Sequence, residues 1–151
     1  MTVFPSFNGG RPIEILLVED NAEEAEWTQT ALRDGRVRNR IHWVEDGEEA
    51  MTFLRRQGAY AAAPRPDLIL LDLHLPRKSG LEVLAEVKQA PDLKRIPIVI
   101  MTTSSDEKDI LQAYDQHANC YVTKPVDMDK FIEAVKSIEE FWLTVVHLPA
   151  A

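Results

Sequence analysis

Cysteine and long apolar runs are scarce in this sequence, and each scarcity excludes a class of protein. The single thiol, Cys120, cannot build an internal disulfide framework, which suits a reducing cytosol. No apolar stretch approaches the roughly 18 residues of a membrane span. The first dozen residues also lack the apolar run behind a basic start that marks a signal peptide. We therefore expect a cytoplasmic protein with no membrane partner.

Basic residues are also in the minority. Lysine and arginine number 17 against 25 aspartates and glutamates, which gives a formal net charge of −8. Proteins that bind nucleic acid usually carry the opposite bias, so we expect no nucleic-acid partner. The densest basic stretch contains Arg33, Arg36, Arg38 and Arg40. We interpret it as a solvated turn.

The length of 151 residues has room for one domain. After an irregular lead-in over 1–12, short apolar runs alternate with amphipathic segments. We expect strands over 13–18, 41–44, 67–73, 96–102 and 120–123, and helices over 21–34, 47–57, 79–89, 105–116 and 127–147. This alternation predicts an α/β fold, a doubly wound parallel sheet with helices on both faces. Ligands of such folds bind beyond the carboxyl ends of the strands.

Charged and hydroxyl residues stand at those carboxyl ends. Glu19 and Asp20 end the first strand, Asp72 the third, Thr102 the fourth and Lys124 the fifth. Three carboxylates at one rim repel each other unless a cation lies among them, and all-oxygen ligands select a hard cation such as Mg²⁺. A cation, an ammonium group and a nucleophilic carboxylate are the groups that an incoming phosphoryl group needs.

These residues lie in stretches that resemble the receiver domain of bacterial response regulators over about residues 13–140. The stretches are ILLVEDN, DLILLDLHLPRKSGLEVL, PIVIMTTS and CYVTKP. The resemblance implies a flavodoxin-like fold with five helices and a five-stranded sheet in the order 2-1-3-4-5. The segments around DLHLPRKSG, NCYVTKP and IEEFWL further resemble phytochrome-associated single-domain response regulators. Their upstream kinase is a red-light photoreceptor.

The resemblance implies a role for each matching residue. Asp72 would accept a phosphoryl group from a histidine kinase, and Lys124 would contact its oxygens. Asp20 would bind Mg²⁺ directly, together with Asp72 and the backbone carbonyl of His74, while Glu19 would act through water. The implied function is a phosphoacceptor in a two-component phosphorelay rather than an enzyme, with only slow self-catalysed phosphotransfer and dephosphorylation.

Two further residues match the family's switch positions. Thr102 would move toward the phosphoryl group, and Tyr121 would turn inward on activation. The family also implies a cis peptide bond between Lys124 and Pro125, which would aim the lysine.

Residues 141–151 extend beyond the receiver resemblance and are too few for a DNA-binding domain. We therefore expect an output by contact with a downstream protein of unknown identity. Apolar residues continue along the last predicted helix at spacings of three and four, which is the pattern of a helix–helix seam. We expect this extension to form a homodimer contact through Phe141, Trp142, Val145 and Val146. The alternative is that the whole stripe belongs to the core.

Three other functions fit parts of the pattern. A haloacid dehalogenase-type hydrolase also uses an aspartate at a strand end, but it needs a second aspartate where this sequence has His74. A flavin-binding domain needs a loop rich in Ser, Thr and Gly after the first strand, and Glu19 and Asp20 would repel the flavin phosphate. A constitutive dimeric scaffold with a vestigial acidic pocket is the third alternative.

Overall fold

The computed structural model describes residues 11–149, and all the strands in this part of the chain belong to one parallel sheet. The strand order is β2-β1-β3-β4-β5, as the resemblance implies. The strands are β1 (Ile13–Val18), β2 (Asn39–Val44), β3 (Leu68–Leu71), β4 (Ile98–Thr102) and β5 (Cys120–Thr123). Most of the lead-in expected over 1–12 lies outside the described residues.

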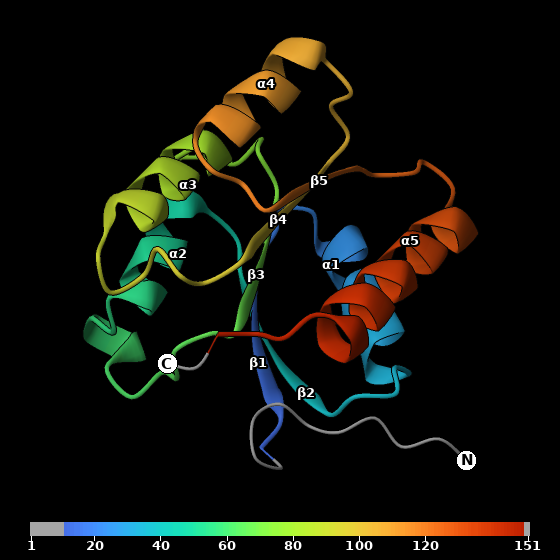
Figure 1. The fold of residues 1–151 in the computed structure, drawn as a ribbon, viewed down its shortest axis with the longest axis horizontal. Helices are drawn as coiled ribbons and strands as arrows, with labels where there is room; N and C mark the ends of the chain where they lie inside the picture. Colours follow the sequence, from blue (N-terminus) through green and yellow to red (C-terminus); the bar gives the residue numbers. More distant parts are fainter. Residues whose placement is uncertain (1–10, 150–151) are drawn as a thin grey trace.

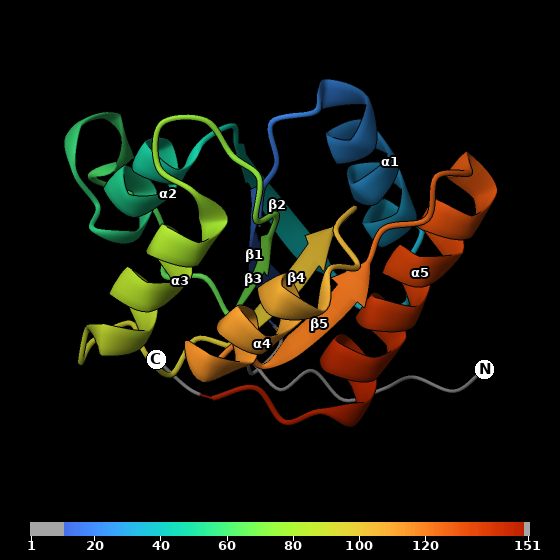
Figure 2. The same ribbon diagram turned by 90° about the horizontal axis from the view of Figure 1, so that it is seen from above.

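A helix follows each strand, as the alternating pattern predicts. The helices are α1 (Ala22–Arg33), α2 (Gly47–Leu54), α3 (Gly80–Gln89), α4 (Glu107–Asp115) and α5 (Met128–Glu140), with a short 3₁₀ turn over Gly58–Tyr60. Figures 1 and 2 show α1 and α5 on one face of the sheet and α2, α3 and α4 on the other. The side chain of Asn21 caps α1 and that of Ser79 caps α3, each by accepting a backbone N–H three residues on.

The sheet divides the core in two because its central strands are buried on both faces. In β1, Leu16 and Val18 pack with residues of α2 and α3, whereas Ile15 and Leu17 pack with residues of α1 and α5. This burial is why the strands are nearly continuous apolar runs rather than alternating ones.

Several elements are shorter than predicted, for local reasons. The helix expected over 47–57 ends at Leu54, because Arg56 takes a positive φ of 54° that helical backbone cannot contain. The strand expected over 96–102 begins at Ile98, after Pro97, which has no N–H to donate.

The last helix differs most from the prediction of one helix over 127–147. Regular α-helix ends at Glu140, and a π turn over Phe141–Val145 follows, closed by the bond from the Val146 N–H to the Phe141 carbonyl. The wider turn shifts the apolar register by one residue. The next buried apolar residue after Ile138 is therefore Leu143, five positions on, instead of Trp142, four positions on.

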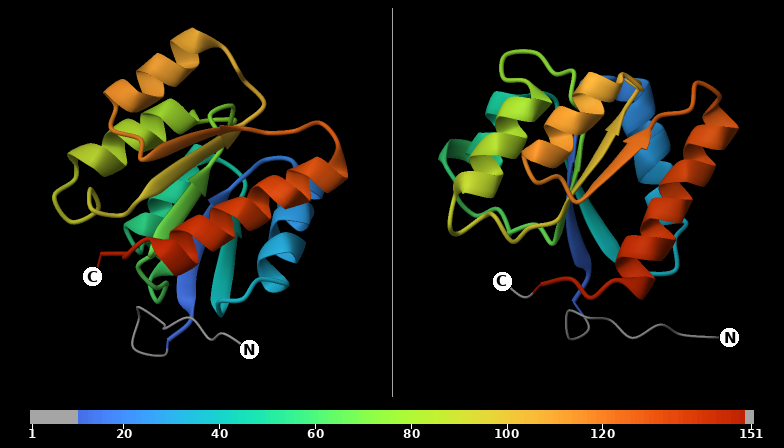
Figure 3. Two further views of the ribbon diagram at one scale, coloured as in Figure 1. Left: turned by 45° about the vertical axis from the view of Figure 1, so that its right-hand side comes forward. Right: turned by 45° about the horizontal axis from the view of Figure 1, so that its top comes forward.

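The residues expected at the dimer surface differ in their exposure. Phe141 and Val145 are 52% and 67% exposed, as a contact surface requires. Trp142 and Val146 are only half-exposed, and Trp142 packs against the core shared by α1 and α5. After α5 the chain runs on past β1 toward its C-terminus (Figure 3), and Leu148 in this segment is buried.

Within residues 11–149, no helix is long and apolar enough to cross a membrane.

The start of α2 yields a prediction about the loop between β3 and α3. A Cβ atom on Gly47 would lie 2.0 Å from the Lys78 carbonyl oxygen in that loop. We expect Gly47→Ala to lower the free energy of unfolding by about 2 kcal/mol, as overpacking does, although alanine is the better helix former. Denaturant titration measures the change. Gly58→Ala is the comparison, because a Cβ atom on Gly58 would meet no other atom within 4 Å. Its positive φ alone should lower the free energy of unfolding by about 1 kcal/mol. A stabilised Gly47→Ala variant would refute the packing argument.

Candidate functional site

Three carboxylates meet where β1 and β3 end. The two strands pair with Val18 opposite Leu71, so Glu19 and Asp72 leave the sheet side by side. Asp72 also donates its backbone N–H to the Val18 carbonyl. Carboxylate oxygens of Glu19, Asp20 and Asp72 all lie within 4.8 Å of one another. Asp20 is exposed, whereas Glu19 and Asp72 are buried.

Lys124 reaches this cluster from the end of β5. Its Nζ atom lies 2.5 Å from Glu19 Oε1, 2.8 Å from Asp72 Oδ2 and 2.7 Å from Glu24 Oε1. Only 3% of the lysine side chain is exposed. The structure therefore brings together the acids and the lysine predicted from the strand ends, and it adds Glu24 of α1 to them.

The position of Lys124 does not require the cis bond that the resemblance implied. Within residues 11–149 no peptide bond is cis, so the Lys124–Pro125 bond is trans and that expectation is wrong for this structure. The lysine backbone N–H continues the sheet ladder by donating to the Thr102 carbonyl at 2.6 Å. From that point the side chain reaches the carboxylates.

The cluster contains more acidic groups than basic ones. Burial raises the pKa of Glu19 from 4.5 to about 7, although the nearby Lys124 ammonium opposes the rise. Burial alone would lower the pKa of Lys124, but the charges of Asp72 and Glu19 together outweigh it and raise this pKa. Three carboxylates thus share one ammonium group, and a fourth acid, Asp20, lies beside two of them.

The donor set fits a hard divalent cation. The three clustered carboxylates offer only oxygen ligands, and their excess negative charge is what such an ion neutralises. Asp20, Asp72 and Glu19 are the residues that could hold it. His74 donates its backbone N–H to Asp72 Oδ1 at 3.2 Å, so its main chain lies beside the same carboxylate. The imidazole of His74 lies 3.9 Å from Asp109 on α4.

The two residues at the expected switch positions lie on neighbouring strands. Thr102 is fully buried, and its hydroxyl has no hydrogen-bond partner in the described part of the chain. The Tyr121 hydroxyl donates to the Ser104 carbonyl at 2.8 Å and so holds the loop between β4 and α4. Burial raises the pKa of this phenol.

Three contributors to the site were missed from the sequence. In the sequence, Glu24 cannot be distinguished from an ordinary acidic residue in the first turn of a helix. Trp43 has the pattern of an apolar residue in an edge strand, yet its indole Nε1 donates to the Glu19 carbonyl at 2.7 Å. Gly80 begins α3, and a Cβ atom there would lie 2.1 Å from the Asp72 carbonyl oxygen. Of these three residues, only Gly80 could have been noticed in the sequence, because a glycine is unusual at the start of a predicted helix.

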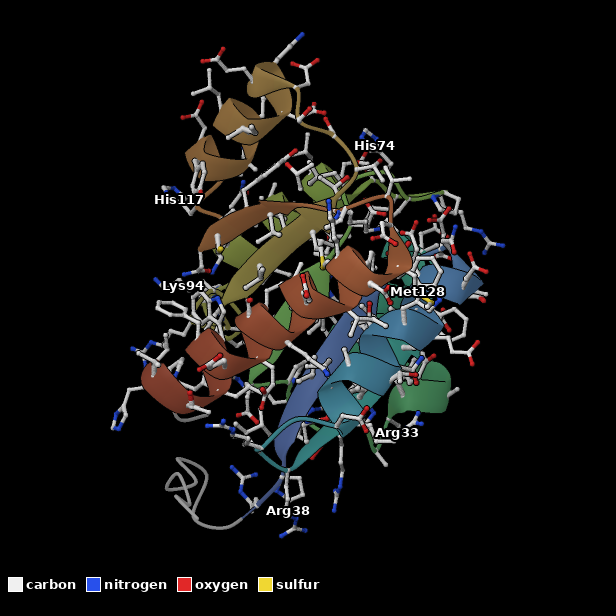
Figure 4. All side chains as sticks on the ribbon, turned by 90° about the vertical axis from the view of Figure 1, so that its right-hand side faces the viewer. Arg33, Arg38, His74, Lys94, His117 and Met128 are labelled. Carbon is white, nitrogen blue, oxygen red and sulfur yellow. The ribbon has the colours of Figure 1, made fainter. Side chains whose placement is uncertain are left out.

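The basic stretch lies elsewhere. A cavity of about 500 Å³ is lined by residues of α1, β2 and the loop between them, including Arg33, Arg36, Arg38 and Arg40. Figure 4 shows Arg38 at the opposite end of the molecule from His74, which follows β3 near the acids. The cavity is therefore remote from the clustered carboxylates.

Comparisons with known proteins agree with this geometry. The family model of the response regulator receiver domain matches residues 15–136. Response regulator Rcp1 of Synechocystis sp. is 49% identical over 140 residues, which are 93% of this chain and 95% of that protein. The crystal structure of Mn²⁺-bound Rcp1 has a TM-score of 0.89 at 49% identity, and the match covers 92% of this chain and all 100% of that chain. The phosphorylated cyanobacterial phytochrome response regulator RcpA has a TM-score of 0.90 at 51% identity, covering 93% of this chain and 100% of that chain.

The raised pKa of Glu19 predicts a pH dependence of stability. Between pH 4.5 and 7 the folded protein keeps a proton on Glu19 that the unfolded chain releases, so stability falls as pH rises through this window. We expect metal-free protein to lose about 2 kcal/mol of unfolding free energy between pH 4.5 and 8. Urea titrations in a chelating buffer measure it. Glu19→Gln should remove most of the loss, and the exposed Glu23→Gln should keep it. Parallel curves for wild type and Glu19→Gln would contradict the assignment.

Proposed function

The chain belongs to the response regulator receiver family, and from that premise we propose that it is a stand-alone response regulator that receives a phosphoryl group on Asp72. The observation that carries this proposal is the position of Asp72. Its carboxylate is buried at the end of β3, within 2.8 Å of the Lys124 ammonium and beside two further acids. The proposed receiver domain spans 13–140, and 141–151 form an extension.

The proposed transfer uses groups already in place. An Asp72 carboxylate oxygen forms a bond to phosphorus while the phosphorus–nitrogen bond of the kinase's phosphohistidine breaks, and the electron pair of that bond stays on the imidazole. Lys124 lies where it can donate to the phosphoryl oxygens. When bound by Asp20, Asp72 and Glu19, Mg²⁺ would supply positive charge against the same oxygens. Mg²⁺ is our proposal from the oxygen donors, and Rcp1 has been crystallised with Mn²⁺.

Family membership also bears on the alternatives. A receiver domain is mainly a phosphoacceptor switch, which favours this function over a haloacid dehalogenase-type hydrolase or a flavin-binding domain. The catalysis that we propose is limited to slow phosphotransfer to Asp72 and slow loss of the phosphoryl group. The constitutive scaffold differs from the proposal in having no phosphorylation-dependent output.

We further infer that the upstream kinase is a phytochrome-type photoreceptor. The support is the 51% identity to RcpA, which is itself a phytochrome response regulator, over its whole chain. A kinase of this class would present the phosphohistidine to the acid-lined end of the sheet. Thr102 and Tyr121 would shift next, and a downstream protein would bind the altered surface.

The phosphoacceptor assignment predicts a single point of modification. With Mg²⁺ and a small-molecule phosphodonor, the wild type should gain one phosphoryl group per chain, measured by intact-mass spectrometry. Asp72→Asn should fall to background, because the amide is a far weaker nucleophile than the carboxylate. Asp92→Asn makes the same charge change in an exposed loop and should behave as wild type. Full modification of Asp72→Asn would contradict the assignment of Asp72 as the phosphoacceptor.

We also propose that the protein forms a homodimer through the exposed part of its extension. Phe141 and Val145 are large apolar residues at one end of α5, and the Phe141 ring packs edge-on against Trp142 at 5.7 Å. Trp142 in turn packs against the core cluster that contains residues of α1, α5 and β5. The patch is thus presented on a braced segment, and exposed apolar patches commonly mark interfaces.

The dimer proposal predicts a change of mass in light scattering after gel filtration. Phe141→Ser combined with Val145→Ser should convert a two-chain species to one chain, because the paired surfaces lose their apolar contact. Leu111→Ser is the matched control, since Leu111 is 58% exposed on α4. If only Leu111→Ser dissociates the protein, the interface lies on α4, and a wild-type monomer would exclude the dimer.

A further inference from the structure

The ammonium group of Lys124 has no unused donor. It carries three N–H bonds and no acceptor, and three carboxylates lie within hydrogen-bonding distance of it. The distances are 2.5 Å to Glu19, 2.7 Å to Glu24 and 2.8 Å to Asp72. With 3% of its side chain exposed, water has little access to it. A phosphoryl oxygen that binds Lys124 must therefore take the place of one of these carboxylates or share a donor with it.

The three carboxylates differ in how firmly each is held. Glu19 also accepts the Asn21 backbone N–H through its second oxygen, and Asp72 accepts that of His74. Within residues 11–149, the only hydrogen-bond or ion-pair partner of the Glu24 carboxylate is Lys124. Its side chain is 22% exposed, against 4% for Glu19 and 9% for Asp72. Glu24 can therefore return to water at the smallest cost.

We propose that Glu24 competes with the phosphoryl group for Lys124. It holds the ammonium in the unphosphorylated protein and releases it when a phosphoryl group is bound at Asp72. This inference rests on the function proposed above, and it makes Glu24 a positioning residue that limits how tightly the site holds a phosphoryl group.

The charges favour the same conclusion. A phosphoryl group carries about −1.5 to −2 charge and three acceptor oxygens. On Asp72 it replaces the single negative charge of the carboxylate, so the negative charge beside an ammonium that already binds two glutamates still increases. If Glu24 stayed in place, its carboxylate and the phosphoryl oxygens would be like charges around one nitrogen atom, which is unfavourable. Removing the Glu24 charge relieves this repulsion and frees a donor.

The test compares two neighbouring glutamates of α1. Glu24→Gln removes the charge at Lys124, whereas Glu23→Gln removes the same charge one residue away at an exposed position without a contact to Lys124. The probe is beryllofluoride in saturating Mg²⁺, followed by intrinsic tryptophan fluorescence, because Trp43 is bonded to the Glu19 carbonyl. Mg²⁺ is titrated alone in parallel, and thermal unfolding checks that each variant is folded.

We expect Glu24→Gln to bind beryllofluoride about three- to tenfold more tightly than Glu23→Gln, with Mg²⁺ affinities of the two variants within about twofold. Glu24→Ala, which also removes the acceptor, should bind beryllofluoride at least as tightly as Glu24→Gln. Equal beryllofluoride affinities for the two glutamine variants would overturn the inference, and so would an equal gain in Mg²⁺ affinity.

Asp72→Asn separates this inference from the function on which it rests. If wild type binds beryllofluoride and folded Asp72→Asn does not, the proposed function stands whatever the Glu24 variants do. If folded wild type binds no beryllofluoride at all, both the function and the competition are wrong.

Discussion

A buried ammonium ion is stable only if its partners replace the water that it has lost, and Lys124 is such an ion. Its partners follow β1 and β3 or lie on α1, whereas the lysine itself follows β5. One charged group therefore joins the carboxyl ends of three strands to the first helix. Removing a partner would leave part of the buried charge uncompensated, so the lysine and its acids depend on one another.

The same cluster carries more negative charge than one lysine can balance. The raised pKa of Glu19 reflects the burial of the group and this excess charge. A higher pKa means that the charged carboxylate is less stable here than it would be in water. A divalent cation would stabilise the charged form. The arrangement is thus better suited to binding than to stability, which is what a site for a metal and a phosphoryl group requires.

Contacts around the cluster connect it to the surface of the domain. Trp43 on the edge strand β2 is bonded to the Glu19 carbonyl, and Gly80 lets α3 begin against the Asp72 carbonyl. On the other side, Tyr121 is bonded to the loop that follows Thr102. Trp43 and Tyr121 thus lie on the two edge strands of the sheet, on either side of the strands that carry the acids. In the function that we propose, a change at Asp72 would reach the surface formed by α4 and β5 through Thr102 and Tyr121.

The sequence alone determined the strand order, through the resemblance, and the meeting of the acids with Lys124 at one rim. The reason is topological: in a parallel sheet every strand ends at the same edge, so residues that follow strands converge whatever their separation along the chain. Only the tertiary structure decided which carboxylates reach the lysine. Glu24 and Lys124 are 100 residues apart, and their contact depends on where α1 lies against β5, which no local pattern encodes. The π turn that buries Leu143 in place of Trp142 is a second case, because packing overrode a regular spacing that predicted a continuous helix.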